Sequence, residues 1–386
     1  MKKIKIVIIT NNYKPYNGGV VSSIETFSQE LIRLGHEVFI ITLDFATNEI
    51  DHDYVIRLDC PIKFKYKKYP IAIPWRYDHQ IIKLINKINP DIIHSQHPFF
   101  LGASALKASK KLNIPIIFTY HSMYEQYAHN VPIPTLISEP IIKKFALGYC
   151  KNVDHVISPT ESTKNFLLKN GIKTNISIIP SGINSIFLSK DYKRDNSNQI
   201  KLLSVSRFTK EKNIPFLLEV FSKLDNNFIL NLVGHGVELE NLQNYAFNIL
   251  NIENNRLNFV VNPEKNEIAQ FYRDSDIFIF ASTSETQGLV LAEAMAGGLP
   301  VIALNASGSS DIIINNHNGF LVENQSEMLE KIKLIRDNKK LKENLHFNAW
   351  QTGQKYSVQE ATRKLIDLFG KLLVSFDKLR TSGRSW

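Results

Sequence analysis

The chain has 386 residues, of which 44% are hydrophobic and 22% are charged. Its length is roughly two to three times that of a typical single domain, which predicts two compact domains, and its composition excludes a largely disordered protein. Lys and Arg outnumber Asp and Glu by 46 to 37, a net charge of +9. This excess predicts an anionic partner: a nucleotide, a nucleic acid or a membrane surface.

Several classes of protein are excluded by what the sequence lacks. The two cysteines, Cys60 and Cys150, are too few for a disulfide framework and have no His or Cys neighbours at metal-ligand spacing. The largely apolar run 4–9, which contains Lys5 and follows Lys2 and Lys3, is too short for a signal peptide and precedes no small-residue cleavage site. No run of 18 apolar residues occurs, so no transmembrane helix is predicted. We therefore expect a cytoplasmic protein.

Short apolar runs alternate with helical patterns in the first half of the chain, which predicts a parallel, doubly wound sheet. A strand over 4–10 precedes a loop with Gly18 and Gly19, and a helix over 20–34 ends at Gly35. A later helix is predicted to start after Thr160. Further strands are predicted over residues 38–43, 91–95, 114–120, 155–159 and 176–180.

The polar, turn-prone segment 189–199 predicts a linker, and beyond it the α/β pattern restarts. Strands are predicted over 201–206, 228–233, 257–261, 276–281 and 300–304, and helices over 214–224, 326–345 and 358–373. Two similar α/β halves result. Because such sheets bind ligands at the carboxyl ends of their strands, we expect the site in a cleft between the halves.

The segment 281–304 contains the most informative motif, with Glu285 and Glu293 eight positions apart. Eight largely helical residues span about 12 Å, enough to hold opposite ends of a nucleotide-sugar. Between them, the amides of Gly288, Leu289 and Val290 begin a helix, where a phosphate is favoured. The alternative is that Glu285 caps the helix and Glu293 is solvated. The apolar neighbours of Glu293 argue against that alternative.

Two weaker features carry charge or a titratable group. Arg207 ends a predicted strand and Lys212 follows five residues later, so both can meet a diphosphate; the alternative is a surface ion pair with Glu211. His121 follows another predicted strand, where a structural role is the alternative. The Asp-x-Asp patterns at 51–53 and 274–276 lie in a predicted loop and at a helix-to-strand junction, and we expect no metal at either.

Together these residues resemble the retaining glycosyltransferases of family 4, over residues 1 to about 370. The resemblance implies a GT-B fold, an α/β architecture with two Rossmann-like doubly wound domains facing across a cleft. The acceptor-side domain would comprise residues 1–190 and be completed by the C-terminal helix at about 356–373. The nucleotide-sugar domain would comprise 200–355, with a disordered tail at 374–386.

Residue roles follow from the same resemblance. Glu285 would contact the donor sugar and Glu293 the ribose, while Val261 belongs to the segment that frames the base. In that segment Asn262 stands where the family commonly has Gly, so the base is left open. The implied catalytic residues are His121, Arg207, Lys212 and Glu285. The implied donor-binding residues are Gly18, Gly19, Gly234, Val261, Gly288, Leu289, Val290 and Glu293.

Residues 95–127 and the sequence ETQGLVLAEAMA are most similar to the diacylglycerol glucosyltransferases, which transfer glucose from UDP-glucose to a membrane lipid. This implies an α-linked product, front-face departure of the diphosphate, and neither metal nor cofactor. The alternative acceptor is a soluble glycan, polysaccharide or lipopolysaccharide. A more distant alternative is a basic nucleic-acid-binding protein without transferase activity; no RNA-binding motif supports it, so we expect no nucleic acid partner.

Cations and aromatic residues alternate over residues 63–77, which favours an anionic lipid surface. Residues 1–190 hold 23 basic and 14 acidic side chains, the whole excess of nine, whereas the remainder is neutral. We therefore expect the protein on the inner face of the cell membrane; a solvated basic face is the alternative. The predicted membrane contacts are Lys63, Lys65, Lys67, Lys68, Trp75, Arg76, Lys107, Lys110 and Lys111.

Overall fold

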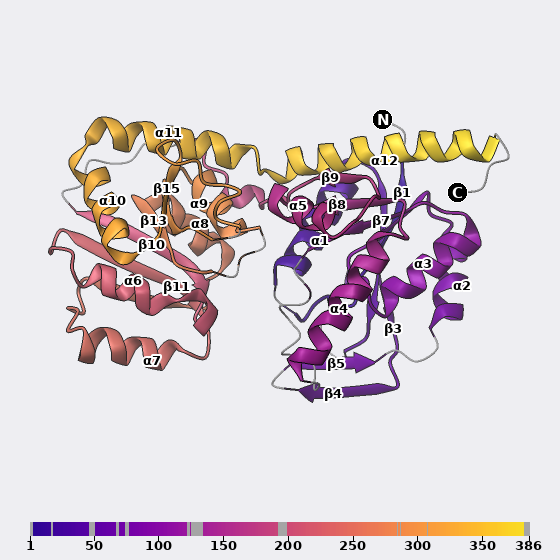
Figure 1. The fold of residues 1–386 in the computed structure, drawn as a ribbon, viewed down its shortest axis with the longest axis horizontal. Coiled ribbons are helices and arrows are strands. Elements are labelled where there is room, and N and C mark those ends of the chain that lie inside the picture. The colour runs from indigo at the N-terminus through magenta and orange to yellow at the C-terminus, as the bar shows by residue number, and fades with distance from the viewer. Residues whose placement is uncertain are drawn as a thin grey trace. The chain divides into compact units, whose positions relative to one another are not determined.

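The computed structural model describes residues 3–16, 18–45, 51–66, 69–73, 77–121, 124, 134–191, 199–283, 285, 287–306 and 308–381. The chain divides into two compact units (Figure 1). The N-terminal unit comprises residues 1–182 and 358–386, and the C-terminal unit comprises 183–357. The chain thus passes between units at residue 182, before the predicted linker, most of which lies outside the described residues.

A seven-stranded parallel sheet forms the N-terminal unit, in the order β3-β2-β1-β6-β7-β8-β9. Its strands are β1 (Lys5–Ile9), β2 (Glu37–Leu43), β3 (Val55–Leu58), β6 (Ile92–Ser95), β7 (Ile116–Thr119), β8 (His155–Ser158) and β9 (Ile176–Ile178). Its helices are α1 (Gly19–Arg33), α2 (Asp78–Ile88), α3 (Leu101–Leu112), α4 (Thr135–Cys150), α5 (Glu161–Lys169) and α12 (Val358–Thr381).

The apolar run of β1 is buried on both faces because successive side chains point to opposite sides. Ile6 and Ile8 pack with α1 and α12, whereas Val7 and Ile9 pack with α2 and α3. In register, Ile6 lies opposite Val38 of β2 and Ile92 of β6. The apolar run of β1 is therefore explained by the helices that cover both faces of the sheet. The C-terminal helix α12 belongs to one of these two layers.

Outside the main sheet, β4 (Ile62–Tyr66) and β5 (Tyr69–Ile73) form an antiparallel hairpin. This hairpin falls within the basic, aromatic segment 63–77. It was not predicted from the sequence as two strands, although residues 62–66 (IKFKY) alternate apolar and basic side chains as a strand with one polar face does.

The C-terminal unit is built around a six-stranded parallel sheet, in the order β12-β11-β10-β13-β14-β15. Its strands are β10 (Ile200–Arg207), β11 (Phe228–His235), β12 (Leu257–Val261), β13 (Ile277–Phe280), β14 (Val301–Leu304) and β15 (Gly319–Val322). Its helices are α6 (Ile214–Phe221), α7 (Leu239–Asn244), α8 (Lys265–Asp274), α9 (Leu289–Ala296), α10 (Gln325–Asp337) and α11 (Lys339–Gln354), with the short helices η2 (Ser185–Phe187), η3 (Lys210–Lys212) and η4 (Tyr245–Ile249).

Two predicted helices differ from the structure. The single helix over 326–345 is wrong: α10 ends at Asp337, and the Asn338 side chain accepts from the Leu341 amide to start α11. The disordered tail is wrong for residues 374–381, because α12 continues to Thr381 with Phe376 buried. Residues 382–386 lie outside the described part of the chain.

Candidate active site

Two segments bearing predicted site residues leave neighbouring strands of the C-terminal sheet at the same edge. β10 and β13 pair where the strand order reverses, the place where such sheets bind ligands. Lys212 lies in η3 after β10, and Glu285 lies in the loop after β13. Lys212 Nζ donates to Glu285 Oε1 in an ion pair whose side chains are only 12% and 18% exposed. The fold therefore brings together two predicted catalytic residues that are 73 positions apart.

Arg207, the other predicted cation, ends β10 and stays outside that pair. Its Nη2 lies 3.2 Å from Glu211 Oε1, and these side chains are 52% and 41% exposed. In the structure Arg207 therefore makes the surface ion pair that was the alternative interpretation. Exposed pairs of this kind contribute about 0–1 kcal/mol, so an anionic ligand can displace Glu211 at little cost. The diphosphate-binding role stays a prediction.

The predicted phosphate site lies at the start of α9. Gly288 is the N-cap, with a φ of +65° that favours glycine. The first bond inside the helix runs from the Leu291 amide to the Gly288 carbonyl. The earlier amides, those of Leu289 and Val290, therefore have no acceptor within α9, and the helix dipole adds positive potential there.

Glu293 is a half-buried carboxyl on the same helix. The Tyr272 hydroxyl of α8 donates to its Oε2 at 3.1 Å. Burial raises the pKa of Glu293 to about 7, although the hydrogen bond from Tyr272 acts in the opposite direction. The alternative of a solvated helix residue is therefore wrong. Tyr272 was missed from the sequence because no local motif connects it to Glu293.

The two remaining predicted donor-binding positions of this unit end neighbouring strands. Gly234 in β11 has a φ of +154°, and an added Cβ would lie 1.8 Å from the Ser206 carbonyl oxygen. The close approach of β11 to β10 is therefore enough to require glycine at position 234, whether or not Gly234 binds the donor. Val261 ends β12 and is 43% exposed. Asn262 follows with a φ of +53°, a conformation that Asn tolerates better than most residues. Asn262 can therefore adopt the positive φ of this turn, although the family commonly has Gly there.

In the N-terminal unit, His121 follows β7 and meets Gln96, which follows β6. His121 Nε2 donates to Gln96 Oε1 at 2.5 Å, and Gln96 is buried. Burial, helped by His97 and His94, lowers the pKa of His121 to about 3, so its imidazole is neutral near pH 7. With Nε2 protonated, Nδ1 carries the lone pair. Gln96 was not among the predicted site residues, since nothing in the motif pairs it with His121.

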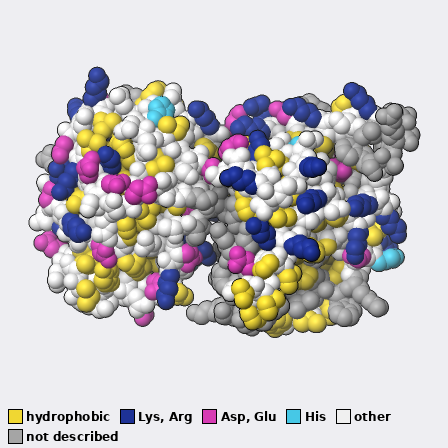
Figure 2. All heavy atoms as spheres, viewed as in Figure 1, with side chains coloured by type: hydrophobic (Ala, Val, Ile, Leu, Met, Phe, Trp, Pro, Cys, Tyr) yellow, Lys and Arg dark blue, Asp and Glu magenta, His cyan; other side chains and the backbone are white. Residues whose placement is uncertain are grey.

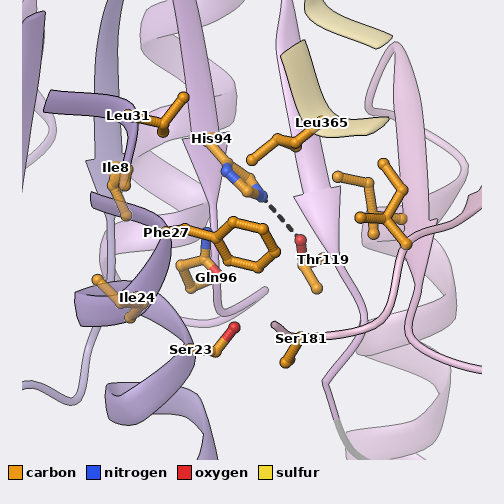
Figure 3. Close-up of a pocket in the computed structure, with 12 residues that line it drawn as sticks. Ile8, Ser23, Ile24, Phe27, Leu31, His94, Gln96, Thr119, Ser181 and Leu365 are labelled. Carbon is orange, nitrogen blue, oxygen red and sulfur yellow. Dashed lines mark hydrogen bonds between the residues drawn. The ribbon is translucent and has the colours of Figure 1, made fainter. Parts of the chain in front are cut away.

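A small cavity lies between α1 and the seven-stranded sheet of the N-terminal unit (Figure 3). The ring of His94 points toward Thr119, with Nε2 and Oγ1 2.7 Å apart, and Ile8, Phe27 and Leu365 enclose it. Burial lowers the pKa of His94 to about 3. The cavity has room for about one water molecule, too little for a sugar or a nucleotide. The cavity itself therefore holds no substrate, although Gln96, the partner of His121, is part of its lining.

The predicted glycine loop lies between β1 and α1 in the N-terminal unit. Gly18 is the extended N-cap of α1, and Gly19 is its first residue. An added Cβ at either position would meet no protein atom within 4 Å. Protein packing thus does not account for the glycines, and their donor-binding role stays a prediction.

The predicted membrane contacts lie in different environments. Lys67, Lys68, Trp75 and Arg76 fall outside the described residues, as does the side chain of Lys65. Lys63 forms ion pairs with Asp44 at 2.6 Å and Asp59 at 2.9 Å, and Lys107 forms one with Asp78 at 2.5 Å. Lys110 and Lys111 are exposed at the end of α3. Among the predicted membrane contacts that the structure describes, Lys63 and Lys107 therefore have their charge compensated by aspartates.

Neither a metal cluster nor a membrane-spanning helix is present among the described residues. No group of three or more His, Cys, Asp or Glu side chains there is placed to hold a metal ion. Of the Asp-x-Asp patterns, Asp51 pairs with Arg57 and Asp276 with Lys342. No described helix combines the length and the hydropathy needed to cross a bilayer.

Solved structures share the fold over nearly the whole chain. Anabaena HepE in complex with UDP and glucose matches with a TM-score of 0.72, covering 95% of this chain and 100% of that one at 16% identity. Sucrose-phosphate synthase from Thermosynechococcus elongatus matches with a TM-score of 0.74, covering 97% and 100% at 19% identity. The predicted GT-B fold, two parallel-sheet α/β domains, is thereby confirmed.

Sequence comparison matches both units to glycosyltransferases. Residues 17–185 match the model of Glycosyltransferase Family 4, and residues 188–352 match Glycosyl transferases group 1. An alpha-monoglucosyldiacylglycerol synthase of Streptococcus pneumoniae is 34% identical over 316 residues, 78% of this chain and 71% of that protein. The protein of that name from Acholeplasma laidlawii is 27% identical over 96% of this chain and 98% of its own length. The chain therefore belongs to glycosyltransferase family 4.

Proposed function

We propose that this glycosyltransferase transfers glucose from UDP-glucose to a membrane lipid such as diacylglycerol, with retention of configuration and without a metal. The observation that carries the proposal is the Lys212–Glu285 pair beside the start of α9, at the switch point of the C-terminal sheet. The choice of lipid is supported by two relatives that are alpha-monoglucosyldiacylglycerol synthases and span most of the chain.

The donor would be held by the described groups around α9. Lys212, together with Arg207 once Glu211 is displaced, supplies positive charge for the diphosphate. The amides of Leu289 and Val290 add donors that need no proton transfer. Glu285, released from Lys212 by the phosphate, accepts hydrogen bonds from sugar hydroxyls. Glu293, as a carboxylate, accepts hydrogen bonds from the ribose.

In the proposed reaction the bond between the anomeric carbon and the diphosphate oxygen breaks first. The acceptor oxygen then bonds to the anomeric carbon on the same face, and its proton passes to the departing phosphate oxygen. Because the departing phosphate oxygen takes the acceptor's proton, the reaction needs no protein base. We therefore assign His121 to positioning the sugar. Its neutral imidazole suits that role, because a group with a pKa of about 3 is a weak base at neutral pH.

The acceptor is proposed to be presented by an anionic membrane on its inner face. The N-terminal half carries the whole net charge of +9, which favours anionic lipid. A soluble glycan or polysaccharide acceptor is the competing proposal for the same donor site.

The test measures UDP release and product formation with UDP-glucose and an acceptor panel. Dioleoylglycerol in phosphatidylglycerol vesicles is compared with soluble sugars and polysaccharide, with and without EDTA. We expect EDTA-insensitive release with lipid only, and an α-anomeric product by NMR coupling constants. Glu285→Gln should abolish release, whereas Glu240→Gln, which removes an exposed carboxylate on α7, should not. Release with soluble glycans alone refutes the lipid acceptor, and an unimpaired Glu285→Gln variant refutes the donor site.

A further inference from the structure

One helix of the N-terminal unit presents large apolar side chains to solvent. Ile137, Ile141 and Phe145 of α4 lie four residues apart and so share one helix face, with Leu136 beside them. These four side chains are 54%, 61%, 47% and 87% exposed. The opposite face of α4 packs into the core through Ala146 and Cys150, and Tyr149, one turn beyond Phe145, is also buried. In Figure 2, hydrophobic side chains gather where Figure 1 places the start of α4 and the β4–β5 hairpin.

This face is continuous with the surroundings of His121 through a series of aromatic contacts. The ring of Phe145 stacks on Phe99 with centroids 5.2 Å apart, and Phe99 meets Tyr124 edge to face at 5.6 Å. The Tyr124 hydroxyl donates to the Gln96 carbonyl at 3.4 Å, and the Gln96 side chain accepts from His121. A chain of contacts thus links the exposed face of α4 to the imidazole; it is aromatic as far as Tyr124 and polar from Tyr124 to His121.

The charges on and near α4 identify the occupant. Lys144 is exposed on the same helix face as Ile137 and Ile141, and Lys143 lies 5.1 Å from the Phe166 ring centroid. The exposed Glu139 is two residues from both isoleucines and so lies on the other side of the helix. The half of the chain that contains them has a net charge of +9. Apolar side chains flanked by cations fit an anionic bilayer surface, in which the former enter the acyl region and the latter meet phosphate groups.

We propose that the exposed face of α4, with Phe99 and Phe100, is the bilayer-inserting surface through which a lipid acceptor reaches His121. This surface differs from the basic segment 63–77 and from the lysines of α3. Phe100, 55% exposed at the N-cap of α3, extends it. The acceptor keeps its acyl chains in the membrane while its hydroxyl approaches along Phe145, Phe99 and Tyr124. The inference rests on the proposed lipid acceptor, and it assigns the place where that acceptor enters.

The experiment compares the Ile137→Ser/Ile141→Ser double variant with Ile249→Ser. Ile249 is a matched control because it is 60% exposed but lies in the C-terminal unit. Binding to vesicles of phosphatidylglycerol and phosphatidylcholine is measured by flotation without donor. Transfer is then measured with dioleoylglycerol in those vesicles and with water-soluble dibutyrylglycerol. A Phe145→Ser variant tests the link between the surface and Phe99.

Removing each large apolar side chain from a lipid contact lowers vesicle affinity about tenfold. We expect about a hundredfold loss of binding for the double variant, a matching rise in KM for dioleoylglycerol, and no change with dibutyrylglycerol. Unchanged vesicle binding, or an equal loss with both acceptors, overturns the inference. So does a wild-type protein that binds no vesicles, the result expected if α4 docks another protein. Vesicle binding with no transfer to any lipid instead refutes the proposed function and leaves α4 as a membrane contact.

Discussion

Glu293 provides a test of the donor site that needs no substrate. Its pKa rises from 4.5 to about 7 on folding because the carboxyl is buried on α9. Between these values the folded chain binds a proton that the unfolded chain has lost, so the free energy of unfolding falls as pH increases. The rise corresponds to about 3 kcal/mol, an upper limit because the side chain is only half-buried. This destabilisation is absent below pH 4.5 and complete above pH 7.

Glu293→Gln removes the charge and retains an oxygen that can accept from Tyr272. We therefore expect the variant to match wild type at pH 4.5 and to exceed its stability by up to about 3 kcal/mol at pH 8. Urea unfolding is followed by fluorescence in a Trp75→Phe/Trp386→Phe background. Trp350, the third tryptophan of the chain, then reports on the C-terminal unit alone.

Glu240→Gln, made in the same background, controls for the loss of one negative charge. The reasoning fails if the stability difference between Glu293→Gln and its parent is constant from pH 4.5 to pH 8. A confirmed difference would mean that the chain retains a destabilising carboxylate at neutral pH, as expected for a residue kept for binding and not for packing.

Three further predictions concern single contacts. Lys212→Met should lower kcat for donor cleavage about 10²- to 10³-fold, measured as UDP release; a loss below tenfold would remove this residue from the charge-stabilising role. Gln96→Leu deprives the His121 Nε2–H of its acceptor, so ¹⁵N NMR should show a mixture of imidazole tautomers and transfer should fall about tenfold; one unchanged tautomer would contradict the assignment. Gly353→Ala should destabilise the C-terminal unit by about 1–3 kcal/mol in urea, because the new Cβ would lie 2.1 Å from the Ala296 amide nitrogen. Gly370→Ala, where no atom lies within 4 Å, should cost nothing, and equal effects would refute the steric argument.

The fold was predictable because its strands are short apolar runs between turn residues. β1, β10 and β13 lie within one residue of their predicted positions, since parallel strands buried on both faces leave a continuous apolar signature. The break at Asn338 was missed because apolar spacing continues through it, and only the cap reveals the new helix.

The candidate site was predictable where its residues are near in sequence, and not where they meet through the fold. Glu285, Gly288 and Glu293 were assigned from one segment, and the structure places them in the loop before α9, at its N-cap and within it, respectively. Tyr272 and Gln96 were missed because each contacts its partner from a different element. The contact of Lys212 with Glu285 depends on the adjacency of β10 and β13, which chain order alone does not specify.

The proposed bilayer-inserting face of α4 shows why charge is a weaker guide than exposure. Lys63 and Lys107 were predicted membrane contacts because they are basic, yet Asp44, Asp59 and Asp78 compensate their charge. Which apolar side chains of α4 are exposed depends on packing, because the same helix also buries apolar residues. Exposed charge is screened over about 10 Å at 0.1 M salt, whereas insertion of apolar side chains is not. If α4 inserts, vesicle binding should therefore survive 0.5 M NaCl once formed, while a purely electrostatic contact would dissociate.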